Sequence, residues 1–128
     1  MLSAIPLPCG LYARSDQDET VTQQLDQGRK FLEHLDDPDL RLIAQYCDSQ
    51  ENGTSMNHQG LNQLRADAEV GWVRVVVVTS LSRFTRSAIQ LSKFIMEMTT
   101  LGVAVVSIND RTCTDAAMHD RFFRTPTK

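Results

Sequence analysis

Hydrophobic residues follow two alternating patterns along this chain: short apolar runs and longer stretches with helical spacing. The clearest run lies within residues 72–86, where positions 75–78 are four consecutive valines. β-Branched residues without polar alternation are typical of a strand that is buried on both faces in a parallel sheet. We therefore predict that this run forms the central strand.

The same patterns predict three further strands and three helices. The strands cover residues 9–13, 39–47 and 103–108, and the helices cover residues 21–35, 60–70 and 87–101. The first strand is expected to start after Pro8, because proline cannot donate a hydrogen bond within a sheet. An Asp or Thr residue is expected to cap the first helix, and Pro38 to end it. Gly71 and Gly102 are expected to cap the other two helices.

Strands and helices that alternate in this way predict a doubly wound α/β fold. We expect a mainly parallel sheet of about four strands with helices on both faces. Residues 1–110 are expected to form one domain, which suits a chain of 128 residues. Residues 111–128 are interpreted as a C-terminal tail, with the possible start of a helix at residues 115–123. Residues 48–57 form a predicted loop.

Composition and charge restrict the classes of function. A net charge of -3 argues against a protein that coats nucleic acid through a broad basic surface. The three cysteines are scattered, which favours buried free thiols in a reducing compartment over disulfides. Neither they nor the histidines have metal-ligand spacing, so we expect no metal and no cofactor. No apolar run is long enough to span a membrane, and the expected location is the cytoplasm.

Polar and charged side chains gather where two predicted strands end. Arg14, Ser15 and Asp16 follow the first strand, whereas Arg83 and Arg86 follow the central one. In open α/β sheets, ligands bind at the carboxyl ends of the strands. Guanidinium groups match phosphate oxygens with paired hydrogen bonds. The sequence therefore indicates a local anion site, with phosphate as the expected ligand.

Several segments also resemble the catalytic domain of the serine recombinases, the resolvase and invertase family. These segments are Tyr12-Ala13-Arg14-Ser15, Gln23-Gln24, Gly60-Leu61 and Leu81-Ser82-Arg83-Phe84-Thr85-Arg86. The resemblance implies a resolvase-like fold and attack of a serine hydroxyl on a DNA phosphodiester, which gives a phosphoserine link and a free 3′ hydroxyl. It also implies that Arg14, Arg83 and Arg86 stabilise the developing charge, and that Gln24 or Gln23 orders the loop of the nucleophile. The implied partners are DNA and a second recombinase subunit, either a copy of this chain or a related protein.

Three positions depart from the family pattern. Without a gap, Asp16 stands at the position of the nucleophile, Ser82 replaces an acidic residue, and His58 replaces an arginine. A carboxylate repels the phosphate that it would have to attack. Deleting one residue after Arg14 instead makes Ser15 the nucleophile and brings its distance to Gln24 into line with the family. Under both alignments we expect impaired or absent catalysis.

Two alternatives to a recombinase remain open. One is a noncatalytic relative that keeps phosphate binding through its arginines. The other is a doubly wound protein that binds a nucleotide or a protein partner, although no Gly-rich phosphate loop follows any predicted strand.

Other residues have simpler structural interpretations. Ser82 is a candidate helix N-cap, and His58 is a candidate surface-loop residue. The remaining two groups are Phe94, Met96 and Met98, expected in the core, and Asp36, Asp37 and Asp39, expected as a solvated helix end.

Overall fold

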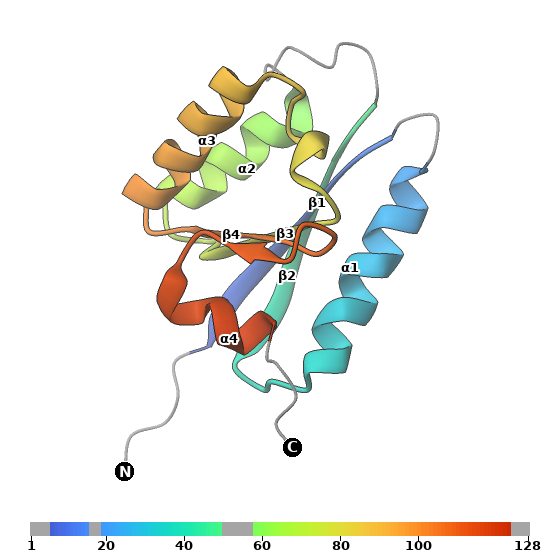
Figure 1. Ribbon diagram of the computed structural model, residues 1–128, viewed down its shortest axis with the longest axis vertical. Coiled ribbons are helices and arrows are strands. Elements are labelled where there is room, and N and C mark those ends of the chain that lie inside the picture. Colours follow the sequence, from blue (N-terminus) through green and yellow to red (C-terminus); the bar gives the residue numbers. More distant parts are fainter. Residues whose placement is uncertain (1–5, 16–18, 50–57, 124–128) are drawn as a thin grey trace.

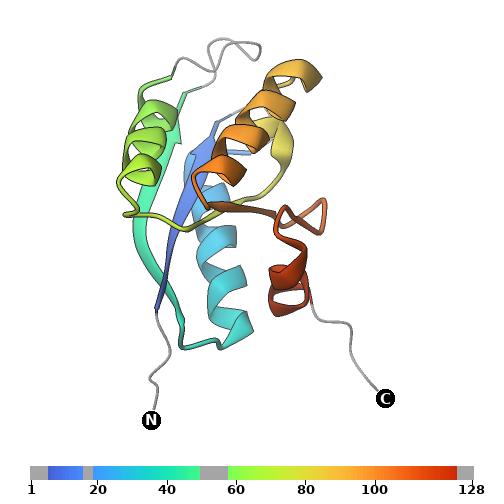
Figure 2. The same ribbon diagram turned by 90° about the vertical axis from the view of Figure 1, so that its left-hand side faces the viewer.

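The computed structural model describes residues 6–15, 19–49 and 58–123 as one α/β domain. Five strands form a single sheet in the order β2-β1-β3-β4-β5. Figure 1 shows α2 and α3 on one face of this sheet and α1 on the other. In the turned view of Figure 2, the short α4 lies beside the β4–β5 end of the sheet. The bounds of the elements are β1 Leu7–Arg14, α1 Val21–Leu35, β2 Leu40–Asp48, α2 Gln59–Glu69, β3 Val75–Val78, η1 Leu81–Arg83, α3 Ala88–Thr100, β4 Ala104–Ser107, β5 Thr112–Cys113, η2 Ala116–Met118 and α4 His119–Phe122.

The valine strand β3 lies in the middle of the sheet, as predicted. It pairs in parallel with β1 on one side and with β4 on the other. Val76 and Val78 pack into the core under α2 and α3, whereas Val75 and Val77 pack into the core on the α1 side. Because successive side chains point to opposite faces, an unbroken run of valines supplies both cores at once.

The predicted doubly wound fold is confirmed, with a fifth strand added. Strands β1 to β4 are parallel, and β5 pairs with β4 in the antiparallel direction. The extra strand comprises only Thr112 and Cys113, which is too short for a hydropathy pattern to reveal. Beyond it, Phe122 and Phe123 pack beside Phe31 of α1, so this part of the predicted tail belongs to the α1-side core.

The predicted ends of the strands and helices lie close to the observed ones, with one informative difference. Strand β1 begins at Leu7 and contains Pro8, which we expected to lie outside it. Pro8 precedes Cys9, the first residue that pairs with Val75 of β3, so its missing amide interrupts no rung of that pairing. Gly71 and Gly102 adopt positive φ angles of 77° and 78°, the conformation of the helix caps predicted there.

Three predictions about individual side chains were wrong. Met96 is 69 % exposed, because α3 already turns Phe94 and Met98 inward and a residue two positions away points to the opposite side. Cys47 is exposed on β2, an edge strand, although Cys9 is buried and all three cysteines are free. Asp37 and Asp39 are not simply solvated, since both accept hydrogen bonds from Arg121 of α4.

The described residues also bear on membrane and metal association. None of the helices in residues 6–15, 19–49 and 58–123 has the length and hydropathy needed to cross a bilayer. Within the same ranges, no group of three or more His, Cys, Asp or Glu side chains is placed to hold a metal ion.

Candidate functional site

The two predicted motifs meet at one edge of the sheet. The chain leaves β1 through α1 to form β2 on one side, and later returns through α2 to form β3 on the other. The carboxyl ends of β1 and β3 therefore flank the point where the strand order reverses, which is where doubly wound proteins bind ligands. Arg14 is the last residue of β1, and β3 leads through Thr79 and Ser80 into η1. We call residues 81–86 the arginine turn.

Arg14 joins the end of β1 to the arginine turn. Its side chain is buried, with the residue 4 % exposed. Nη2 donates to the carbonyl oxygen of Ser82 at 2.9 Å, and Nη1 donates to that of Phe84 at 3.4 Å. The ring of Tyr12 stacks on Phe84 with centroids 5.2 Å apart. The guanidinium thus fixes the arginine turn by binding two of the turn's backbone carbonyls. Because these acceptors are uncharged, they do not neutralise the positive charge of Arg14.

Arg83 and Arg86 bring two more positive charges to the same place. Burial lowers the pKa of the Arg83 guanidinium, and the charges of Arg14 and Arg86 lower it further. Burial likewise lowers the pKa of Arg14, with a further contribution from Arg86. Arg86 is exposed, whereas the Arg83 side chain is 12 % exposed and forms an ion pair with Glu19 at 2.9 Å. The three arginines therefore converge, and Glu19 offsets part of their charge.

Gln24 holds the end of β1 from the first turn of α1. Its Oε1 accepts from the backbone amide of Arg14 at 3.1 Å, and its Nε2 donates to the Arg14 carbonyl at 2.7 Å. The same Nε2 donates to the carbonyl of Glu19 at 3.2 Å. Of the two glutamines considered from the sequence, Gln24 therefore contacts the arginine site. Gln23 instead completes the capping box of α1 with Thr20.

The two candidate nucleophiles lie at the limit of what is described. Strand β1 ends at Arg14, and the half-buried Ser15 follows it at once. The Ser15 amide still donates to the carbonyl of Asp48 at 3.2 Å, so the backbone remains attached to β2 there. Asp16 lies outside the described residues.

Ser82 does not have the capping role that its sequence position suggested. The N-cap of α3 is Ser87, whose hydroxyl accepts from the amide of Gln90 at 3.3 Å. Ser82 lies within η1 and is exposed, and its carbonyl accepts a hydrogen bond from Arg14. The reason is that a 3₁₀ turn and six further residues separate β3 from α3, so the helix starts later than the motif.

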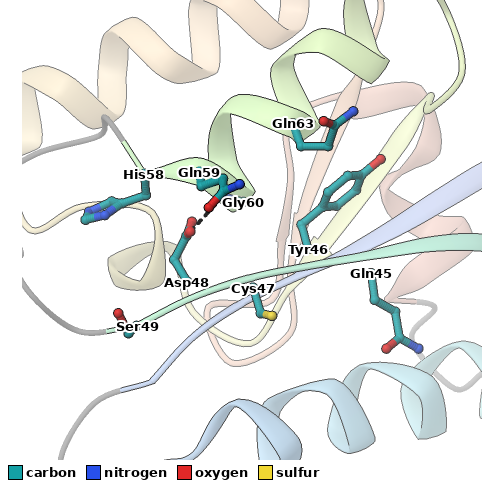
Figure 3. A pocket seen from close by; sticks show the side chains of 9 residues that line it. All are labelled: Gln45, Tyr46, Cys47, Asp48, Ser49, His58, Gln59, Gly60 and Gln63. Atoms are coloured by element: carbon teal, nitrogen blue, oxygen red, sulfur yellow. Dashed lines mark hydrogen bonds between the residues drawn. The ribbon is translucent and has the colours of Figure 1, made fainter.

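His58 lies at the N-cap of α2 beside a polar pocket of about 580 Å³, shown in Figure 3. It is a half-buried residue rather than a simple surface-loop histidine. Among the described residues, its Nε2 is a buried atom without a hydrogen-bond partner. His58 itself does not cap the helix with its side chain. The pocket is lined by Gln45, Tyr46, Cys47, Asp48, Ser49, His58, Gln59, Gly60 and Gln63.

Asp48 performs the capping of α2 from the end of β2. Its carboxylate accepts from the amides of Gly60 at 2.7 Å and Leu61 at 3.0 Å, and from the hydroxyl of Tyr12 at 2.8 Å. Burial and the hydrogen bond to Asp48 raise the pKa of the Tyr12 hydroxyl well above its usual value. A side chain at position 60 would collide with the carbonyl of Cys47, which explains the glycine. A carboxylate therefore satisfies two of the backbone amides at this end of α2.

Sequence reasoning missed three carboxylates that shape the site: Glu19, Asp48 and Asp110. Glu19 lies between the first predicted strand and the first predicted helix, in a segment to which we assigned no role, and Asp48 was assigned to the predicted loop of residues 48–57. Asp110 accepts from the amide of Leu81, the first residue of η1, at 3.0 Å. A carboxylate after a strand is a weak signal in one sequence, because it gives no indication of which distant amide or cation it meets.

Comparison with solved structures identifies the fold. The N-terminal catalytic domain of TP901-1 integrase is similar with a TM-score of 0.79 and 22% identity, over 90% of this chain and 87% of that one. A resolvase family site-specific recombinase from Streptococcus pneumoniae has a TM-score of 0.70 and 22% identity, over 91% and 83% of the two chains. The C-terminal catalytic domain of ISC1926 TnpA, an IS607-like serine recombinase, has a TM-score of 0.69 and 23% identity, over 80% and 67%.

The sequence itself supplies the family. None of the curated proteins is similar enough to count as a relative. The resolvase N-terminal domain family, however, matches residues 10–127, a range that contains most of β1, all of β3 and the arginine turn that follows β3. This chain therefore belongs to the resolvase N-terminal domain family, the catalytic-domain family of the serine recombinases.

Proposed function

We propose that this chain binds the DNA backbone as a serine recombinase catalytic domain and cleaves it with reduced activity. The observation that supports this best is the convergence of Arg14, Arg83 and Arg86 at the carboxyl ends of β1 and β3. Charge develops on the nonbridging phosphate oxygens during in-line displacement, and fixed guanidinium groups stabilise it. Family membership further implies work on DNA as a dimer or with a partner recombinase.

The three arginines are assigned different tasks. Arg14 is buried and donates to two backbone carbonyls, so it orders the arginine turn and adds a positive field. Arg86 is exposed and is the guanidinium best placed to contact a phosphate directly. Arg83 serves as a second phosphate ligand once its ion pair with Glu19 is exchanged for the anion.

Ser15 is the nucleophile in this proposal. Its hydroxyl oxygen forms a bond to phosphorus, the bond from phosphorus to the 3′ oxygen breaks, and the serine proton is transferred to the departing oxygen. Support comes from the end of β1 at Arg14, which leaves Ser15 outside the strict alternation of the strand. Reduced activity is expected because Ser82 offers no carboxylate and His58 replaces a permanently charged arginine.

A nicked suicide duplex, from which the cleaved strand fragment diffuses away, tests the cleavage step. Incubation with the wild-type chain is expected to give a protein–DNA adduct whose peptide mass maps to Ser15. Ser15→Ala should remove the adduct without weakening DNA binding. An adduct elsewhere, or none from a folded chain that binds DNA, would contradict Ser15 as the nucleophile.

DNA binding is tested separately with Arg86→Ala. We expect its affinity for a short duplex to fall about ten-fold, and the slope of log affinity against log salt to decrease by about one. Stability should change by less than about 0.5 kcal/mol, because Arg86 is exposed. Lys30→Ala is the matched control, since Lys30 is 74 % exposed on α1 and paired only with Asp26 in the described structure. Equal binding by both variants would contradict the proposed phosphate site.

A second candidate function is a noncatalytic phosphate-binding subunit. The ion pair between Arg83 and Glu19 favours it, because a neutralised guanidinium contributes less to a transition state than a free one. This candidate predicts salt-dependent DNA binding that is lost with Arg86→Ala, together with no adduct on the suicide duplex.

A further inference from the structure

The arginine turn has no cap of its own at its start. Its 3₁₀ helix η1 begins at Leu81, and the preceding residue, Ser80, makes no side-chain capping hydrogen bond. The Leu81 amide donates instead to Oδ2 of Asp110 at 3.0 Å, across 29 positions of sequence. Because amides at the first turn of a helix lack internal partners, this carboxylate satisfies a group that would otherwise depend on solvent.

The Asp110 carboxylate is itself held in place. The hydroxyl of Ser107, a completely buried residue at the end of β4, donates to the same Oδ2 at 2.6 Å. The chain then reverses through residues 108–111, closed by a bond from the Arg111 amide to the Ile108 carbonyl at 3.2 Å. Arg111 has a positive φ of 52°, which completes the reversal into β5. Oδ2 is thus aimed at Leu81 from a fixed position on the sheet.

Asn109 adds a parallel connection next to Asp110. Its backbone amide donates to the carbonyl of Thr79 at 2.8 Å, and its side-chain Nδ2 donates to the hydroxyl of Ser80 at 3.2 Å. Gln27 of α1 donates to Oδ1 of Asn109 at 3.2 Å. The loop after β4 therefore lies alongside the segment that leads from β3 into η1. Asn109 bonds to Thr79 and Ser80, and Asp110 bonds to the next residue, Leu81.

We propose that Asp110 is a positioning residue for the arginine turn. It fixes the first residue of η1, while Arg14 binds the Ser82 and Phe84 carbonyls further along the same turn. Between these two attachments the backbone carries Arg83. This inference rests on the proposed function, since the turn is held in order to present guanidinium groups to phosphate.

Charge alone predicts the opposite effect of Asp110. A carboxylate near a phosphate site repels the ligand, so its removal should tighten DNA binding if only charge matters. A positioning role requires instead an oxygen that accepts two hydrogen bonds, whether or not it is charged. Asn provides such an oxygen, because its carbonyl has two lone pairs. Asp110→Ala and Asp110→Asn therefore separate the two explanations.

The experiment measures duplex DNA affinity and amide hydrogen exchange for both variants. For Asp110→Ala we expect DNA binding about five-fold weaker than wild type, with faster exchange at Leu81 and Arg83. For Asp110→Asn we expect wild-type exchange and affinity equal to or tighter than wild type. If Asp110→Ala binds DNA as tightly as wild type, or if Asp110→Asn is as weak as the alanine variant, the positioning role is wrong.

Two controls keep the test decisive. Asp115→Ala removes a comparable cap, since Asp115 accepts from the Ala117 amide at 3.0 Å at the start of η2, and it should leave DNA binding unchanged. If Asp110→Ala does not fold, Ser107→Ala replaces it, and this variant should show an intermediate loss of affinity and of Leu81 protection. A wild-type chain without affinity for DNA would overturn the proposed function, whereas unchanged Leu81 exchange in Asp110→Ala would overturn the positioning role alone.

Discussion

Two arginines at opposite edges of the sheet show how the same side chain is used in contrasting ways. Arg14, at the carboxyl end of β1, donates to two uncharged carbonyl oxygens. Arg121, in α4, donates to carboxylates near the amino end of β2, at 2.6 Å to Asp37 and 3.1 Å to Asp39. Burial lowers the pKa of Arg14, whereas the hydrogen bond to Asp37 raises that of Arg121.

The difference lies in what happens to the positive charge. Carboxylates both orient and neutralise a guanidinium. The charge of Arg121 is therefore neutralised by Asp37 and Asp39, and these ion pairs connect α4 to the loop before β2. Carbonyls orient a guanidinium without neutralising it. The edge that contains Arg14 therefore retains positive charge next to Arg86, as an anion site requires.

Replacing Arg14 should have the largest effect on stability. Arg14→Leu keeps much of the side-chain volume but leaves the carbonyls of Ser82 and Phe84 without their donor. We expect the free energy of unfolding to fall by about 3 kcal/mol, measured by urea denaturation. Arg14→Lys, which keeps the charge but not the planar fork, should lose less. A loss below about 1 kcal/mol for Arg14→Leu would mean that the turn is held by other contacts.

Removal of Arg121 should have a smaller effect. The side chain is 32 % exposed, so water partly replaces its ion pairs in Arg121→Ala. We expect a loss of about 1 kcal/mol that shrinks as salt is raised, and no change in DNA binding. Lys30→Ala, which removes an exposed pair within α1, should be nearly neutral by comparison. If Arg121→Ala weakened DNA binding, the two arginine sites would not be electrostatically separate.

The smallest effect is expected from Glu19→Gln. This substitution removes the carboxylate that pairs with Arg83, so the arginine site would differ still more in net charge from the site of Arg121. The amide no longer neutralises Arg83, so affinity for duplex DNA should rise about three-fold, most clearly at low salt. Fluorescence anisotropy over a salt series measures this change. Unchanged affinity would indicate that Arg83 does not take part in phosphate binding and serves only to fasten the loop that contains Glu19.

Sequence reasoning worked where a local rule decides the structure. Four valines in a row predicted β3, because successive β-branched apolar residues favour a strand with two buried faces. Gly71 and Gly102 predicted helix ends, because positive φ angles favour glycine. The pairing of Arg14 with the arginine turn was predictable because parallel strands bring their carboxyl ends to a common edge.

The partners of the individual charges were not predictable in this way. Glu19, Asp110 and Asp37 each meet a group far away in sequence, and which group they meet depends on packing of loops rather than on spacing. The prediction that Met96 lies in the core failed for a related reason, since hydrophobicity alone does not say which side of α3 faces solvent. The fold and the convergence of Arg14 with the arginine turn thus follow from sequence patterns, whereas the partners of the carboxylates require coordinates.

The paired hydrogen bonds between Gln24 and the backbone of Arg14 have a further consequence. A primary amide that both gives and receives a hydrogen bond imitates a peptide group, so this side chain acts as a neighbouring strand one residue long. A carboxylate of equal length can only receive, and an aliphatic chain can do neither. Position 24 should therefore tolerate neither glutamate nor leucine, because the final rung of β1 depends on the chemistry of one side chain.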